Sequence, residues 1–445
     1  MRKVILSFAA CAPLAFGAAP AGAETLRDAL ALAYETNPTI RAERARLRAT
    51  LETRSQAWAG ALPQITASGS YNRVDSSQEA LFPGQQAPET VDADLNTLTA
   101  GVDAEQPVFT GLRNFNTIRQ ARARVRAGGA QLAGTEQEVL RDVATAYFDV
   151  QLNMAVFELN RQNVEVLRRQ NEMATVRFEV GEVTRTDVAQ SEARLADARA
   201  QLSQAQGNLA VARATYAQLV GQTPGDLEPV EGLPDLPETL DTAQTLAREF
   251  APAAISAREQ AEVSRRQIAI ARGALLPSVS LTAGYQYAEE PSAFALNDEQ
   301  FTFGARASVP IFQGGLNYSR IREARALHAS DRSRVIEAER LVEAQVTSAW
   351  QNLTAARVII LSAQSSVEAN TLALEGVRQE ALVGTRTTLD VLDAEQELLN
   401  AEVSLVNAER DAQTAAFTLL AAVGLLTPEA IGVPTEGDAL DLYQD

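Results

Sequence analysis

Residues 316–383 form one continuous stretch without proline and with a single glycine, Gly376. As a helix this stretch would extend about 100 Å, which is longer than a globular domain accommodates. Small and apolar residues then recur at alternating spacings of three and four in the segment that follows, and again in the first half of the chain. They are Val391, Ala394, Leu398, Ala401, Leu405, Ala408, Ala412, Ala415 and Leu419, and Val188, Ser191, Leu195, Ala198, Leu202, Ala205, Leu209, Ala212 and Tyr216. The pattern predicts long helical hairpins whose arms pack as coiled coils.

The two halves of the chain are copies of one unit. A Glu-Thr-Leu at 24–26 recurs at 238–240, and the sequence Pro-[Val/Ile]-Phe-x-Gly at 107–111 recurs at 310–314. We therefore divide the chain into repeats at 24–237 and 238–445. Each repeat is expected to hold short helices, a strand pair and a long helical hairpin. The strand pairs are expected at about 64–107 and 278–310, and the hairpin tips at about 181–187 and 383–393.

Each strand pair has strict alternation of apolar and polar residues, which is typical of strands with one apolar face. In the first repeat Ile65, Ala67, Gly69 and Tyr71 alternate with polar residues, and Val279, Leu281, Ala283 and Tyr285 do the same in the second. Residues 75–94 are rich in Ser, Gln, Pro, Gly and Asp, and part of them has no counterpart in the second repeat, so we expect an exposed loop there.

The strands have the length of tilted membrane-spanning strands. Ordinary hairpins of a soluble sandwich would show the same alternation. Four strands cannot close a barrel, however, and lipid does not tolerate an open sheet edge, so membrane strands would require several chains to share one barrel.

The N-terminus has the pattern of a secretory signal peptide. Arg2 and Lys3 precede an apolar run and small residues, so we expect residues 1–23 to be removed. A lipid anchor at Cys11 is the alternative, which fits less well because the apolar run before it is short. The net charge of −18 argues against nucleic acid as a partner.

The residue inventory argues against an enzyme. Cys11 is the only cysteine and His328 the only histidine, which excludes zinc clusters, Cys-His pairs and disulfides in the mature chain. We interpret His328 as solvated helix surface. No phosphate-binding glycine loop is present, so we expect no catalytic residue, no cofactor and no metal.

The tip of the second hairpin carries the most informative charges. Gly384 can end the long helix with a positive φ, and Thr387 and Asp390 have the spacing of a capping box. Asp393 follows on the same helical face, so several copies of this tip around an axis would form an acidic ring. Arg386 lies in the turn itself.

The first tip matches the second only in its structural residues. Gly181 matches Gly384 and Asp187 matches Asp390, but Val183 and Gln190 stand where the second tip has Arg386 and Asp393. Capping alone would account for the two aspartates shared by both tips. It does not account for the two charges that only the second tip has.

The duplicated Leu-Pro before a strand, the Pro-[Val/Ile]-Phe-x-Gly after one and the tip sequence at 383–393 resemble the TolC-like outer membrane efflux family, also called outer membrane factors. The resemblance covers essentially the whole mature chain. It implies a homotrimer in the bacterial outer membrane, with four strands per chain in one twelve-stranded transmembrane β-barrel. A long α-helical coiled-coil barrel would continue this β-barrel through the periplasm.

The same resemblance implies roles for the tip residues. Asp390 and Asp393 would line the periplasmic entrance, and Arg386 would bond across to a neighbouring tip at Thr186 and Asp187. Ala381 departs from the family pattern, which has a tyrosine there that helps to close the tip.

The implied function is an exit duct of a tripartite efflux pump or a type I secretion system. Its partners would be outer membrane lipid, a periplasmic adaptor (membrane fusion protein) and an inner-membrane transporter of the RND, ABC or MFS type. The sequence leaves drug efflux and protein secretion open. The alternative is a periplasmic coiled-coil adaptor or structural spacer, which would need one hairpin flanked by soluble β domains instead of a duplicated hairpin with its own strands.

Overall fold

The structure, a computed structural model, describes residues 23–430 except 81, 82, 85, 88, 231, 293 and 294, together with Gly432. The expected signal peptide, which includes Cys11, lies outside the described residues except for its last residue, Ala23. Residues 431 and 433–445 of the C-terminal tail lie outside them as well. The elements are α1 (Leu26–Thr36), α2 (Pro38–Ala59), β1 (Gln64–Ala80), β2 (Glu89–Phe109), α3 (Arg113–Glu179), α4 (Arg185–Val220), α5 (Leu240–Phe250), α6 (Pro252–Gly273), β3 (Ser278–Ser292), β4 (Ala295–Ser308), α7 (Leu316–Leu382) and α8 (Thr388–Val423).

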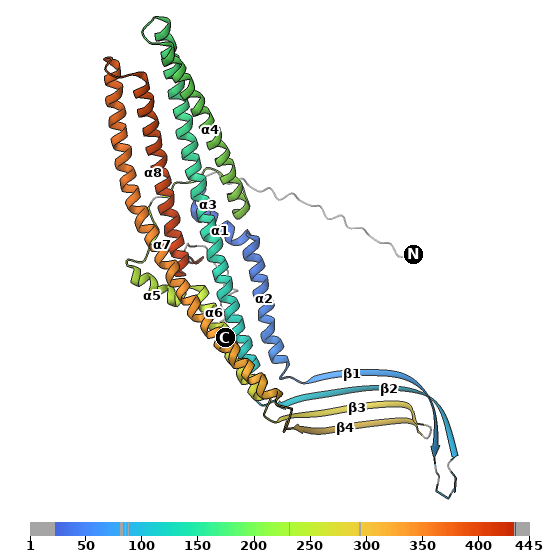
Figure 1. Ribbon diagram of the computed structural model, residues 1–445. Helices are drawn as coiled ribbons and strands as arrows, with labels where there is room; N and C mark the ends of the chain where they lie inside the picture. The colour runs from blue at the N-terminus through green and yellow to red at the C-terminus, as the bar shows by residue number, and fades with distance from the viewer. Residues whose placement is uncertain are drawn as a thin grey trace, which may run out of the picture.

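Two helices of 67 residues, α3 and α7, run the length of the helical part (Figure 1). Each folds back into a shorter helix at its tip, so that α3 pairs with α4 and α7 with α8. At the other end α2 packs on α3, and α6 packs on both α3 and α7. Pro38 and Pro252 begin α2 and α6, where a missing N–H costs nothing. Each long helix is therefore accompanied by two shorter helices, one along each part of its length: α2 and α4 lie along α3, and α6 and α8 lie along α7. No helix within the described ranges is both long and apolar enough to cross a membrane.

The four strands form one antiparallel sheet in the order β1-β2-β3-β4, at the end away from the tips (Figure 1). Tyr71 pairs with Leu98, and Tyr285 pairs with both Val102 and Phe301. This register places the predicted apolar residues of all four strands on the same face of the sheet. The opposite face carries polar residues, including Asp103, Glu105 and Arg306. The predicted one-sided strands are confirmed.

The prediction of an exposed loop at 75–94 is wrong for most of this segment, which is β-strand. β1 continues to Ala80 and β2 begins at Glu89, and these two residues are paired in register. Polar residues can extend a β-hairpin because the ladder is made by backbone groups, and cross-strand charge pairs add to it. Arg73 and Asp94 form such a pair at 2.7 Å.

The main core lies midway along the helices, where α1, α3, α4 and α8 meet. Tyr147 and Tyr216 are fully buried there. The hydroxyl hydrogen of Tyr147 is shared between the backbone oxygens of Glu24 and Glu228, at O···O distances of 2.8 and 2.7 Å, and Tyr216 donates to the Glu24 carboxylate at 2.6 Å. Burial, followed by the negative charge of Glu24, raises the pKa of Tyr147. These bonds fix the start of the described chain against the core.

His328 differs from its expected place on a solvated surface. The ring is half-buried between α6 and α7, and its Nδ1 lies 3.2 Å from the Ser264 hydroxyl. The local sequence is polar, and only the packing of α6 on α7 brings the two side chains together.

Candidate functional site at the hairpin tips

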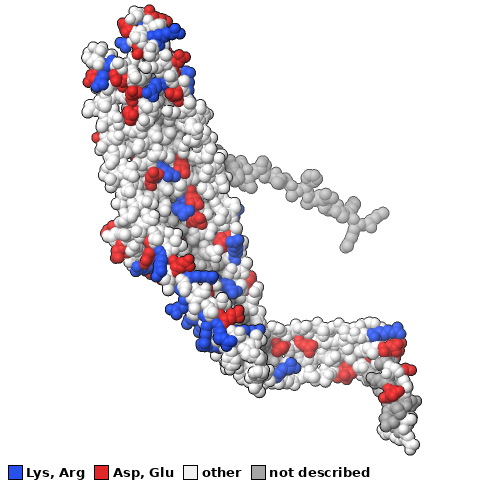
Figure 2. Space-filling view, viewed as in Figure 1, with Lys and Arg blue, Asp and Glu red and all other residues white. Residues whose placement is uncertain are grey.

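Both hairpin tips lie at the end of the molecule opposite the sheet (Figure 1), and charged side chains of both signs gather there (Figure 2). Gly181 and Gly384 have φ values of 80° and 79°. A Cβ at either glycine would meet no atom within 4 Å. Glycine is therefore favoured at these turns by backbone conformation and not by lack of space.

The same backbone bonds close both turns. The Gly384 amide donates to the Ala381 oxygen at 3.1 Å, and the Thr385 amide donates to the Glu380 oxygen at 3.0 Å. The first tip has the equivalent pair, with the Glu182 amide donating to the Arg177 oxygen at 2.8 Å. This is the arrangement in which a left-handed residue after the helix satisfies its last carbonyl groups. The turns thus form from local sequence alone.

Capping boxes begin both outgoing helices. The amide and the hydroxyl of Thr387 each donate to Asp390 Oδ2 at 2.8 Å, and the Asp390 amide donates back to the hydroxyl at 3.2 Å. Thr184 and Asp187 make the same bonds at 2.8, 2.8 and 3.3 Å. The backbone bond and then the hydroxyl bond hold the pKa of both aspartates below the ordinary value. Capping occupies one carboxylate oxygen, and the described residues offer no partner to Asp390 Oδ1.

Asp393 is not free. Its Oδ1 lies 2.6 Å from Arg194 Nη2, so the pair joins α8 of the second hairpin to α4 of the first. Leu392 is 2 % exposed and packs beside it against Leu195 and Leu167. An ion pair over a small apolar cluster therefore connects the two hairpins near their tips.

No pattern in the sequence predicted a role for Arg194. It follows Asp187 by seven residues and so lies on the same face of α4. This spacing is the only feature of the sequence that connects Arg194 with the tip. The sequence does not reveal that this face meets α8.

Arg386 finds a partner within its own turn. Its Nε lies 2.8 Å from Glu380 Oε2, with both side chains about half exposed. Within the single chain Arg386 does not reach Thr186 or Asp187, and the exposed Thr186 lies in the first turn of α4. The link from Arg386 to a neighbouring tip therefore stays a prediction.

A second ion pair lies deeper in the same hairpin. Arg378 of α7 contacts Glu395 of α8 at 2.5 Å, and the Glu395 side chain is 9 % exposed. The first repeat has Thr175 where the second has Arg378. Burial, and then the charge of Glu395, raises the pKa of Glu402, which lies about two turns further along the same face of α8.

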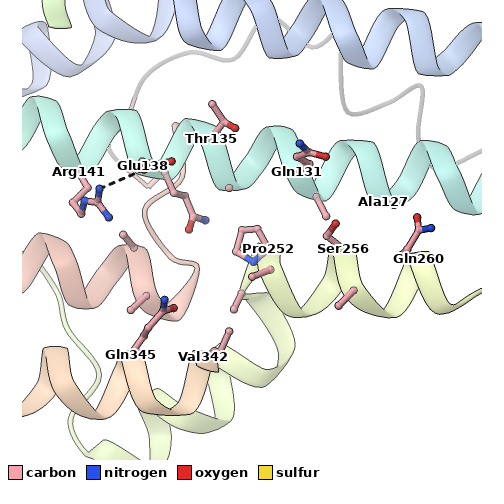
Figure 3. A pocket seen from close by; sticks show the side chains of 18 of the residues that line it. Ala127, Gln131, Thr135, Glu138, Arg141, Pro252, Ser256, Gln260, Val342 and Gln345 are labelled. Carbon is pink, nitrogen blue, oxygen red and sulfur yellow. Dashed lines mark ion pairs between the residues drawn. The ribbon is translucent and has the colours of Figure 1, made fainter. Parts of the chain in front are cut away.

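A groove of about 1010 Å³ lies between α3, α6, α7 and α8, far from the tips. Gln131 of α3, Pro252 of α6 and Gln345 of α7 border it, with the Glu138–Arg141 pair at one end (Figure 3). No set of three or more acidic, histidine or cysteine side chains suited to a metal ion occurs in the described part of the chain.

The family model described as outer membrane efflux protein matches residues 29–222 and 244–425. The chain belongs to this family. It is 32 % identical over 412 residues to the outer membrane efflux protein BepC of Brucella suis, covering 92 % of this chain and 87 % of BepC. It is 27 % identical over 440 residues to the outer membrane protein TolC of Vibrio cholerae, covering 97 % of each chain.

Solved structures of the family share the fold. The CmeC outer membrane channel of Campylobacter jejuni superposes with a TM-score of 0.80 at 17 % identity, covering 92 % of this chain and 90 % of CmeC. The predicted fold is thus confirmed: four strands per chain belong to a trimeric twelve-stranded transmembrane barrel, which a periplasmic helical barrel continues.

Family membership also decides the place and the kind of function. The protein is an outer membrane channel that extends into the periplasm, and it forms the exit duct of an efflux or secretion system together with an adaptor and an inner-membrane transporter. The alternative of a periplasmic adaptor or spacer is thereby excluded.

Proposed function

We propose that the two tips form the gated periplasmic entrance of this duct, with Asp390 and Asp393 lining the opening and Arg386 helping to hold it closed. One observation carries the proposal. Both tips build the same turn and the same capping box, yet Arg386 and Asp393 occur only in the second. A turn that forms equally well with Val183 and Gln190 does not need these charges.

Three chains around an axis would bring six carboxylates to a narrow opening. Confinement in a low-dielectric wall strengthens their field and attracts cations. Arg194 offsets part of this charge, since it lies beside Asp393. The entrance would therefore be moderately cation-selective, and the electrostatic field at the opening would depend on whether Arg194 lies beside Asp393.

We infer that the duct is passive and not an enzyme. An inner-membrane transporter of the RND, ABC or MFS type would supply energy, and the adaptor would contact the tips. The 67-residue helices place the tips roughly 100 Å from the strands, which suits a contact made across the periplasm.

The substrate class is not decided by similarity. The alkaline protease secretion protein AprF of Pseudomonas aeruginosa and the fusaric acid resistance protein FusA of Burkholderia cepacia are 26 % and 27 % identical to this chain. A deletion strain tested both for drug sensitivity and for lost secreted proteins would separate the two roles.

Single-channel conductance in planar bilayers tests the gate. Arg386→Ser should raise the conductance, because it removes the guanidinium that can bond a carboxylate on an adjacent tip. Arg185→Ser is the matched control: Arg185 is an exposed arginine of the first tip and has no ion pair in the described structure. Equal conductance of wild type and Arg386→Ser would show that Arg386 serves only its own turn through Glu380.

A further inference from the structure

Exposed aromatic and arginine side chains form a stripe at the sheet end of α3. Phe115, Arg119 and Arg122 are spaced by four and three, so they share one helical face. Phe115 is 50 % exposed, and the Arg119 guanidinium carbon lies 4.2 Å from the centre of its ring. We call these three residues the α3 stripe.

A matching stripe begins α7. Tyr318, Arg322 and Arg325 are spaced by four and three, and Tyr318 is 62 % exposed. We call these residues the α7 stripe. In both stripes an aromatic residue lies nearest the sheet and arginines follow it.

The charge of this region is opposite to that of the chain. Residues 113–135 contain five arginines and no acidic residue, although the net charge of the protein is −18. Basic side chains are concentrated where the helices meet the sheet (Figure 2). Nearby arginines are paired, as in Arg126–Glu259 and Arg334–Asp331, but the stripe arginines have no ion pair among the described residues. Within one chain, these four guanidinium groups are therefore without an acidic partner among the described residues.

The neighbours of α3 within its own chain indicate which way the α3 stripe faces. In the same chain α3 has α2 on one side and α6 on the other, so its exposed faces can only be the inner and outer faces of the wall. Arg124 borders the groove on one of these faces, and the stripe occupies the other. Phe115 lies in the first turn of α3, six residues after β2 ends, and an exposed aromatic residue so close to a membrane strand is typical of the lipid interface, which favours the outer face for the stripe.

The stripes also lie at the right depth. The apolar sheet face is exposed, with Ile65 and Phe301 at 73 % and 75 %, and β2 ends at Phe109, just before α3 begins at Arg113. Arg119 and Arg122 therefore lie roughly 10–15 Å into the helix. A long arginine side chain can reach back from there to the headgroup layer.

We propose that the α3 and α7 stripes bind the phosphate groups of anionic phospholipids in the periplasmic leaflet of the outer membrane. A guanidinium forms paired bonds with phosphate, and basic residues next to a membrane span attract anionic lipid. The aromatic residue of each stripe would lie at the interface and the arginines just above it. The stripes would hold the β-barrel at a fixed depth relative to the helical barrel.

The test compares lipid retention by the intact protein. Purified oligomer in nonionic detergent is mixed with equal amounts of phosphatidylglycerol and phosphatidylcholine of the same chain length, and retained lipid is measured by mass spectrometry. The wild type should retain phosphatidylglycerol preferentially. Arg119→Gln with Arg122→Gln should reduce that preference about fivefold per arginine removed, and added salt should reduce it in the wild type.

Arg124→Gln is the control for each single substitution, because it removes one positive charge from the opposite face of the same helix. It should keep the preference, and Arg119→Lys with Arg122→Lys should keep part of it. Equal retention of the two lipids by the wild type would overturn the proposal, as would an unchanged preference in the glutamine variant or an equal loss in Arg124→Gln. If the double variant does not assemble, Arg119→Gln and Arg322→Gln singly carry the same test.

Discussion

At the scale of single residues, the tip aspartates have different surroundings. Asp390 is held ionised by its capping bonds, whereas the charge of Asp393 is offset by Arg194. The Arg194 and Asp393 side chains are 39 % and 53 % exposed. Solvent-exposed pairs of this kind contribute about 0.2–1 kcal/mol. The pair therefore affects the charge of the entrance more than the stability of the fold.

Arg194→Gln should increase cation selectivity, because it leaves the Asp393 carboxylate without its counter-charge. The measurement is the reversal potential in asymmetric salt. Arg199→Gln removes an exposed arginine from the same helix and should change it little. Exchanging the charges, with Arg194→Asp and Asp393→Arg together, should restore selectivity toward that of the wild type. Unchanged selectivity in Arg194→Gln would place Asp393 away from the ion path.

At the scale of elements, each hairpin depends on a short turn between helices of very different length. The turn and the cap are built from neighbouring residues, so they are the same in both repeats. The contacts that join the hairpins near their tips, Arg194–Asp393 and the Leu392 cluster, are made once per chain and lie apart from the main core further along α3 and α8. Opening of the tips can therefore break the contacts between hairpins while each turn stays intact.

Thr387→Ala should weaken the start of α8, because it removes both bonds of the hydroxyl to the capping box. Such a cap contributes about 1 kcal/mol, so hydrogen exchange should become faster in the first turn of α8. Thr388→Ala, at a neighbouring threonine without a described side-chain bond, is the control. Equal exchange in both variants would contradict the capping role.

The cap should also depend on pH in a defined direction. The pKa of Asp390 is lowered in the folded state, mainly by the bond from the Thr387 backbone. Its contribution is complete above the ordinary aspartate pKa and is lost as the pH falls through the lowered pKa. Acid should therefore lower the protection factor at this turn, which is the intrinsic exchange rate at that pH divided by the measured rate, in the wild type and less so in Thr387→Ala.

At the scale of the whole molecule, the sheet has two open edges, β1 and β4. Lipid provides no hydrogen-bond partner for an open edge, so each edge must pair with a strand of another chain. The long helices do not close this gap, because they leave the sheet at one end (Figure 1). Membrane insertion and assembly are thus coupled.

The mature protein should purify from outer membranes as an oligomer that survives detergent without heating and separates into monomers when boiled. Gel migration of heated and unheated samples measures this. A detergent-solubilised monomer with its full β content by circular dichroism would contradict the shared barrel.

Features that depend on neighbouring residues could be predicted from the amino-acid sequence. Period-two strands, a proline-free 67-residue helix, the glycines of the turns and the capping boxes all follow from local periodicity and local hydrogen bonding. The duplication predicted that both halves would repeat the same elements. The family resemblance, which rests on short motifs, then supplied the trimer and the roles proposed for the tip charges.

The side chains that meet across elements could not be predicted in this way, because their contacts depend on how the helices and strands pack. Arg194 contacts Asp393 because α4 lies beside α8, and His328 is half-buried because α6 packs on α7. The hairpin of β1 and β2 extends through a polar segment because backbone pairing does not require apolar side chains. These contacts join residues far apart in the chain, and a linear pattern specifies which face a side chain occupies but not what that face will meet.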